Sequence, residues 1–175
     1  MIHESGTGNH EVGRRRGGCG IGRHAVLACL TLYPGLWAAD IDIVGISNFV
    51  TFLENTAPYR RPLRETEYGS LDKDRIFLES ISPLHKADRI KAPLLIIHGK
   101  NDPRVPVTEA FQVRDAVEKN GGIVEMLVFD DEGHSIENKE NKIAALKKRI
   151  AFLEKHVENR GGNAACPARG QEAGE

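Results

Sequence analysis

Two short runs of apolar and β-branched residues dominate the middle of the chain, at residues 93–97 and 123–129. Each run is continuous rather than alternating, which is typical of parallel strands that are buried on both faces. The segment between them has the pattern of a helix that begins near Pro106 and stops at Asn120-Gly121. The pattern therefore predicts a β-α-β unit whose two strands lie side by side in one parallel sheet.

Further elements are predicted on both sides of this unit. Residues 24–33 form a short apolar helix that Pro34 ends, and residues 41–44, in the run ADIDIVGIS, form a third strand. A final helix is expected from about residue 138 to 157, because apolar residues recur there at helical spacing. This predicted buried stripe consists of Ile143, Leu146, Ile150, Leu153 and Val157.

Residues 47–90 are a long excursion between two predicted strands, with the pattern of two or three short helices. Its Tyr59, Arg60 and Arg61 have two open interpretations, as residues that face a ligand or as surface residues in salt bridges. The residues of the excursion that we expect to face inward are Phe49, Phe52, Leu53, Phe77 and Leu78.

The two ends of the chain have no apolar period. Residues 1–23 are rich in Gly and Arg from Gly13 onward, and residues 159–175 are rich in Gly and Ala. Segments of this kind have little to bury, so we expect a disordered arm and a disordered tail. One folded unit is therefore predicted, from residue 24 to 158. The arginines at residues 14–16 lack interleaved aromatic residues, which favours a solvated segment over a nucleic-acid contact.

Composition narrows the classes of function. The chain has 175 residues, 40% of them hydrophobic and 28% charged, with a net charge of -1. This balance gives no global field that attracts nucleic acid or an anionic membrane, and no apolar run is long enough to cross a bilayer. The three cysteines, Cys19, Cys29 and Cys166, have neither a disulfide pattern nor a metal-ligand spacing. We therefore predict a cytoplasmic protein with no partner among nucleic acids or membranes.

Polar residues with catalytic potential follow both strands of the β-α-β unit. Asp102 follows the first strand and His134 follows the second. Adjacent parallel strands end at the same edge of a sheet, which is where sites collect in open α/β folds. Either residue alone has a simpler interpretation, Asp102 as a turn former before Pro103 and His134 as a loop histidine. Together they predict a carboxylate within hydrogen-bond reach of an imidazole base, which is two thirds of a nucleophilic triad.

These residues carry a resemblance. The sequence HGKNDPRVP, followed by a predicted helix, a strand and DEGH, resembles the C-terminal half of the prolyl oligopeptidase family of α/β-hydrolases, near its acylaminoacyl-peptidase and dipeptidyl-peptidase members. The resemblance covers roughly residues 24 to 158. It implies a truncated α/β-hydrolase fold, a remnant of a parallel sheet with flanking helices. It also implies that Asp102 is the triad acid, that His134 is the triad base, and that short peptides are hydrolysed through an acyl-enzyme without any cofactor.

The position of the nucleophile departs from the family pattern. The family has G-G-S-Y-G-G just before a helix that ends in Tyr-Pro. Counting back from Tyr33-Pro34 without a gap, residues 18–23 of this chain read GCGIGR, and Gly20 stands in the place of the serine. A glycine has no side chain that attacks a carbonyl. Cys19 is the alternative nucleophile, but it lies one position away and would point away from the base.

Three hypotheses follow for the function. The chain is an enzyme that acts through Cys19 or a group from a partner, or it is a non-catalytic fragment that pairs its exposed sheet edge at residues 41–44 with another chain, a second copy included. The third hypothesis is that the chain is the product of a truncated or frame-disrupted gene. The abrupt loss of the resemblance near residue 24 favours the third. Under the second and third hypotheses the chain is inactive as a peptidase, and this is the outcome that we expect.

Overall fold

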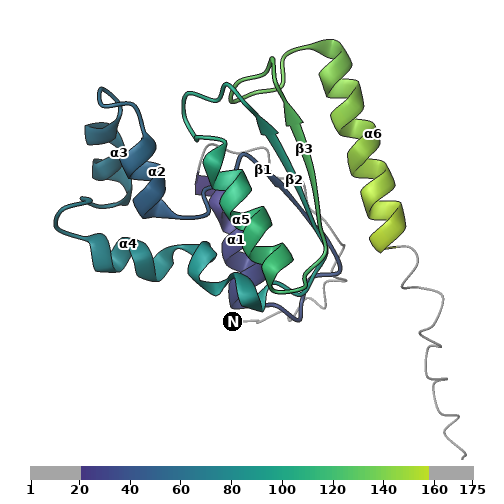
Figure 1. Cartoon of the computed structure of the whole chain (residues 1–175), viewed down its shortest axis with the longest axis horizontal. Helices are drawn as coiled ribbons and strands as arrows, with labels where there is room; N and C mark the ends of the chain where they lie inside the picture. The colour runs from purple at the N-terminus through teal and green to yellow at the C-terminus, as the bar shows by residue number, and fades with distance from the viewer. Residues whose placement is uncertain (1–20, 158–175) are drawn as a thin grey trace, which may run out of the picture.

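The computed structural model of the chain describes residues 21–157 and contains one parallel three-stranded sheet. The strands are β1 (Asp40–Ile43), β2 (Leu94–Gly99) and β3 (Val124–Phe129), in the order β1-β2-β3 (Figure 1). Every residue of β2 is buried, as expected for the central strand of a parallel sheet. All three strands end at the same edge, so the loops after β2 and β3 emerge beside each other.

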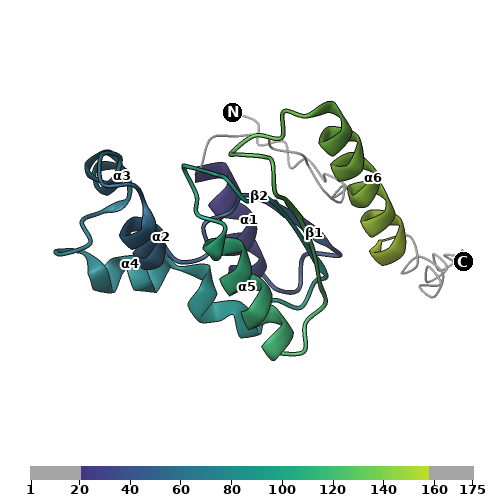
Figure 2. The same cartoon turned by 45° about the horizontal axis from the view of Figure 1, so that its top comes forward.

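Helices cover both faces of the sheet. Helices α1 (Ile21–Leu32) and α5 (Thr108–Lys119) lie on one face, and α6 (Lys139–His156) lies on the other (Figures 1 and 2). The 3-10 helix η1 (Pro83–Arg89) packs against α1 and α5. Their shared core with the sheet consists of Leu27, Leu30, Ala87, Ile90, Ala92, Leu94, Ile96, Ala110, Val113 and Val117.

The excursion forms a helical cluster beside the sheet (Figure 1). It contains α2 (Phe49–Asn55), α3 (Arg61–Tyr68) and α4 (Arg75–Ile81), which confirms the predicted short helices. Its core consists of Ile46, Phe49, Val50, Phe52, Leu53, Leu71, Leu78 and Val105. The prediction for Phe77 is wrong, since its side chain is 54% exposed. Phe77 and Leu78 are neighbours on one helix turn, and Leu78 takes the inward direction.

The predicted stripe on α6 is also partly wrong. Helix α6 contacts the sheet mainly through Ala145 and Phe152, whereas Ile143, Leu146 and Ile150 are 44–49% exposed. Leu153 and Val157 pack against the core beside Phe152. The helical spacing was therefore recognised correctly, but the helix is rotated so that one side of its apolar surface lies outside the contact with the sheet.

The other predicted elements are confirmed with shifted ends. Helix α1 begins at Ile21, three residues before the predicted start, and the remaining bounds differ by at most two residues. A parallel sheet with flanking helices was the predicted fold class, and it is the observed one. Residues 1–20 of the predicted arm, Cys19 and Gly20 among them, and the tail fall outside the described residues, so the expectations about them stay predictions. Residues 21–23 belong to α1 and not to a disordered arm.

Candidate active site

The acid of the candidate site lies in a tight turn after β2. The Oδ1 atom of Asp102 accepts hydrogen bonds from the backbone N–H groups of Arg104, at 2.7 Å, and Val105, at 3.1 Å. These two donors fix the direction of the carboxylate, whose side chain is fully buried. Burial alone would raise the pKa of Asp102, but the hydrogen bonds from His134, Arg104 and Val105 outweigh it and hold that pKa below its ordinary value.

The base lies in the loop that joins β3 to α6. The Nδ1 atom of His134 is 2.7 Å from Oδ2 of Asp102, and the imidazole is only slightly exposed. An ionised carboxylate can only accept, so Nδ1 carries the hydrogen and donates it. The structure therefore confirms that the two predicted side chains lie within hydrogen-bond reach. In this arrangement the carboxylate orients the imidazole, and Nε2 is the ring nitrogen that would transfer a proton.

Gly99 lets the loop of the base approach the end of β2. A Cβ atom at this position would collide with the backbone oxygen atoms of Gly133 and Glu132 and would lie 2.8 Å from the carbonyl carbon of Glu132. Any larger residue must therefore displace the segment that leads directly into His134. Gly99 was not predicted as a site residue, because nothing in the sequence around a strand-end glycine indicates which backbone segment approaches it.

Glu132 fixes the same loop from its other side. Its buried carboxylate accepts hydrogen bonds from the backbone N–H groups of Glu137, at 2.8 Å, and Asn138, at 2.9 Å, and from the side chain of Asn141, at 2.8 Å. These bonds, first of all the one from Glu137, lower the pKa of Glu132. In the sequence, Glu132 is noticed only as part of DEGH. In the structure its hydrogen bonds hold the loop of His134 against the start of α6.

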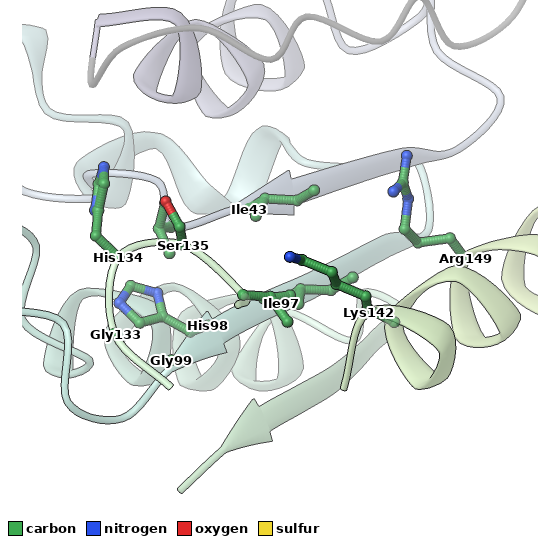
Figure 3. Close-up of a pocket in the computed structure, with 12 residues that line it drawn as sticks. Ile43, Ile97, His98, Gly99, Gly133, His134, Ser135, Lys142 and Arg149 are labelled. Atoms are coloured by element: carbon green, nitrogen blue, oxygen red, sulfur yellow. The ribbon is translucent and has the colours of Figure 1, made fainter. Parts of the chain in front are cut away.

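A cleft of about 270 Å³ opens beside the imidazole on the α6 side of the sheet. Its apolar wall comes from Ile43, Ile97 and Ile136, and its polar rim from Ser135, His134, Lys142 and Arg149 (Figure 3). The residues of the excursion that could face a ligand, Tyr59, Arg60 and Arg61, do not line this cleft. Tyr59 is largely exposed, and Arg61 lies 3.3 Å from Glu65 in an ion pair, which favours the surface interpretation for Arg61.

The described part of the chain offers no activated thiol in place of the serine. Burial first, and the nearby carboxylate of Asp40 second, raise the pKa of Cys29, so its reactive thiolate is disfavoured. Among residues 21–157 no group of three or more His, Cys, Asp or Glu side chains is arranged to hold a metal ion. In the same residues no helix is long and apolar enough to cross a membrane.

Comparisons with known proteins agree with this geometry. Dipeptidyl aminopeptidase BIII of Pseudoxanthomonas mexicana is 38% identical over 137 residues, which are 75% of this chain and 20% of the relative. Dipeptidyl peptidase family member 6 of Caenorhabditis elegans is 36% identical over 128 residues, which are 70% of this chain and 17% of the relative. The chain thus spans about a fifth of the length of these curated relatives.

Solved structures of peptidases superpose on the described fold. A puromycin-hydrolysing peptidase of Mycobacterium tuberculosis has a TM-score of 0.72 at 26% identity, over 78% of this chain and 20% of that structure. An acylaminoacyl peptidase of Pyrococcus horikoshii has a TM-score of 0.70 at 21% identity, over 88% of this chain and 24% of that structure, which shows the shared α/β-hydrolase fold.

A sequence model of the prolyl oligopeptidase family matches residues 17–160. This match covers more than two thirds of the chain, and it includes the three strands, both helical layers and the Asp–His pair. The chain therefore belongs to the prolyl oligopeptidase family of serine peptidases.

Proposed function

We propose that this chain carries the acid–base part of a serine-peptidase site, with Asp102 as the orienting acid and His134 as the base. The 2.7 Å bond between Oδ2 and Nδ1, at the shared edge of β2 and β3, is the observation that supports this most. In a triad the base takes the proton of the nucleophile and later gives it to the leaving amine. The substrate class is short peptides, by analogy with the relatives whose names describe dipeptidyl peptidases. These roles need no metal and no cofactor.

We further propose that the chain does not hydrolyse peptides by itself, because Gly20 takes the place of the nucleophile. Residue 20 comes directly before α1, which begins at Ile21. The nucleophile of an α/β-hydrolase occupies the turn into a helix, so this start of α1 supports the gap-free alignment of Gly20 with the family serine. A cytoplasmic location likewise stays a prediction.

A hydrolysis assay tests this function. The purified chain is incubated with chromogenic dipeptide amides and with an activated ester, beside the Pseudoxanthomonas dipeptidyl aminopeptidase BIII as positive control. We expect no turnover above buffer. The Gly20→Ser variant is also expected to be inactive. A new serine supplies the nucleophile but not the donors that stabilise the oxyanion, and the triad and these donors act as a unit. Turnover by the unmodified chain that disappears in His134→Ala would overturn the proposal.

A second candidate function is association with another copy of this chain, and the apolar side of α6 favours it. Within the described residues β1 has a strand neighbour on one side only. The N–H groups of Asp40 and Val44 point to β2, so that of Ile41 points to the outer edge. The side chain of Asp40 already accepts that N–H at 2.7 Å, which weakens strand pairing at this edge. Association would therefore rely on the exposed side chains of Ile143, Leu146 and Ile150.

Light scattering over a range of concentrations tests this second function. Concentration-dependent dimers that disappear in Ile150→Lys would support it. A monomer at all concentrations, in both the unmodified chain and the variant, would leave the apolar side of α6 without a role in self-association.

A further inference from the structure

His98 is a buried histidine that the acid–base pair does not use directly. It is the last residue but one of β2, and its side chain is 1% exposed. Its Nε2 atom lies 3.0 Å from the carbonyl oxygen of Val105. A carbonyl oxygen only accepts, so this distance places a hydrogen on Nε2, which donates it to Val105. From the sequence, His98 is expected to be a strand-end histidine without a catalytic role.

Val105 joins His98 to the acid. Its N–H donates to Oδ1 of Asp102 at 3.1 Å, while its carbonyl accepts from His98. Its side chain is buried in the core of the excursion, against residues such as Phe52. The turn from residue 102 to 105 is thus held at three points, which are the carboxylate it surrounds, the imidazole below it and the helical cluster beside it.

His98 also lies close to the atom that orients the base. Its Nε2 is 3.8 Å from Oδ2 of Asp102, the oxygen that accepts from His134. This distance is too long for a hydrogen bond, and the N–H on Nε2 already donates to Val105, so His98 lies next to the carboxylate without bonding to it. Histidine at this position therefore acts on the carboxylate through Val105, whose carbonyl it holds and whose N–H donates to Asp102.

We propose that His98 is a positioning residue of the acid–base pair, which holds the turn of residues 102–105 so that Oδ2 of Asp102 faces Nδ1 of His134. The inference rests on the proposed function only in calling Asp102 and His134 an acid–base pair. Its physical content is that removing the Nε2 donor leaves the carbonyl of Val105 without this partner, loosens the turn and lengthens the bond between Asp102 and His134.

The test uses NMR of the imidazole groups, which needs no catalytic turnover. A hydrogen held between Nδ1 of His134 and a carboxylate gives a resonance at low field, and Asp102→Asn defines the spectrum without that carboxylate. In His98→Phe, which keeps the ring volume but removes the donor, we expect the His134 resonance to broaden or disappear. In His98→Gln, whose amide nitrogen can reach the position of Nε2, we expect it to persist.

His24 provides a matched control. Its Nδ1 lies 3.2 Å from the carbonyl oxygen of Ile46, so it makes the same kind of bond in another place, and its ring packs edge to face against Phe49. His24→Phe is expected to lower the unfolding temperature without changing the His134 resonance. If His98→Phe does not fold, His98→Asn replaces it, since the shorter amide does not reach Val105 and the resonance is again expected to disappear.

The possible outcomes separate this inference from the proposed function. A His134 resonance that is present in the unmodified chain and unchanged in the folded His98→Phe or His98→Asn variant overturns the role of His98 alone. A resonance that is absent from the unmodified chain contradicts the acid–base pair and overturns both. Peptide turnover by the unmodified chain contradicts the proposed inactivity and leaves the positioning role in place.

Discussion

The two faces of the sheet differ in how completely helices cover them. On the face of α1, α5 and η1, ten buried residues, Leu94 and Ile96 among them, form one core, whereas the core on the face of α6 has six. On the opposite face the structure describes one helix, α6 (Figure 2). The cleft beside His134 is lined by residues of α6 and of the end of β1. Ile41 and Ile43 are accordingly only half-buried there.

This difference teaches where the order of the site comes from. We call the face under α1, α5 and η1 the closed face and the face with α6 and the cleft the open face. The closed face fixes β2, β3 and α5, and Asp102 lies between β2 and α5 in the chain. The loop of His134 is instead fixed by local contacts, from Gly99 on one side and Glu132 on the other. The pair is therefore held by the closed face, by its own two turns and, through Glu132, by the start of α6.

The largest expected effect compares a core residue of the closed face with an apolar residue of the open one. Ile96→Ala removes a fully buried side chain and should lower the free energy of unfolding by about 3 kcal/mol. Ile150→Ala, at a half-exposed position of α6, should lower it by less than about 1 kcal/mol. Urea unfolding of both variants measures the difference. Equal losses would mean that the open face is covered in solution.

The second prediction concerns the junction of the closed face with the helical excursion. The buried carboxylate of Glu109, in the first turn of α5, accepts from the N–H and hydroxyl of Ser47, the N–H of Asn48 and the hydroxyl of Thr51. Glu109→Ala leaves the buried N–H groups of Ser47 and Asn48 without this acceptor, so we expect a loss of about 2–3 kcal/mol in unfolding free energy. Glu109→Gln keeps an acceptor and should lose less than about 1 kcal/mol.

Glu109 also gives the closed face a dependence on pH. Burial raises its pKa despite the hydrogen bonds from Thr51, Asn48 and Ser47. The folded state then binds the proton more tightly than the unfolded state. The stability from this group is complete below the ordinary pKa of a glutamate and is lost as pH rises through the raised value. Unfolding curves across this range should show the loss in the unmodified chain and not in Glu109→Gln; the same curve in both would contradict it.

The third prediction tests the loop of the base. Gly99→Ala places a methyl group against the backbone of Glu132 and Gly133, so we expect a loss of about 2 kcal/mol and a displaced His134 resonance. Gly35→Ala is the matched control, because no atom lies within 4 Å of its added Cβ. The control should stay within about 0.5 kcal/mol of the unmodified chain. A normal His134 resonance in Gly99→Ala would show that the loop tolerates the methyl group.

The smallest effect is expected at the contact of α6 with β3. Glu125 of β3 accepts from Lys148 at 2.7 Å, Lys155 at 2.8 Å and His156 at 3.4 Å, and these bonds, first of all the one from Lys148, lower its pKa to about 2. The depressed pKa adds stability above the ordinary value of 4.5, which is lost as pH falls toward about 2. Because the group is partly exposed, Glu125→Gln should lose less than about 1 kcal/mol at neutral pH.

Acid unfolding followed by circular dichroism measures this contribution. The loss of stability between neutral and acid pH should be smaller in Glu125→Gln than in the unmodified chain. Glu154→Gln, at an exposed position of the same helix, is the control and should keep the original curve. If both variants behave alike, the ion pairs of Glu125 do not secure α6.

The sequence allowed the strands and the pair to be predicted, because each depends on local pattern. Continuous apolar runs located β2 and β3, and Asp102 and His134 follow directly from the ends of those runs. The supporting residues depend on tertiary approach. Gly99 matters because the segment before His134 crosses it, and His98 matters because Val105 folds back over it.

The prediction of which α6 side chains are buried was partly wrong for a related reason. Helical spacing identifies apolar side chains, but the neighbours that cover them decide which ones are buried. Here the sheet takes Ala145 and Phe152, and Ile143, Leu146 and Ile150 remain half-exposed. An apolar period therefore predicted the helix correctly and its buried side only in part.

The most direct test of the account is the location of the hydrogen on His134 in the unmodified chain. Heteronuclear NMR of the imidazole nitrogens, recorded well above the ordinary pKa of a histidine, distinguishes a hydrogen on Nδ1 from one on Nε2. The account predicts a hydrogen on Nδ1 that is held by Asp102, and a changed spectrum in Asp102→Asn. A hydrogen on Nε2, with the same spectrum in Asp102→Asn, would contradict the oriented acid–base pair.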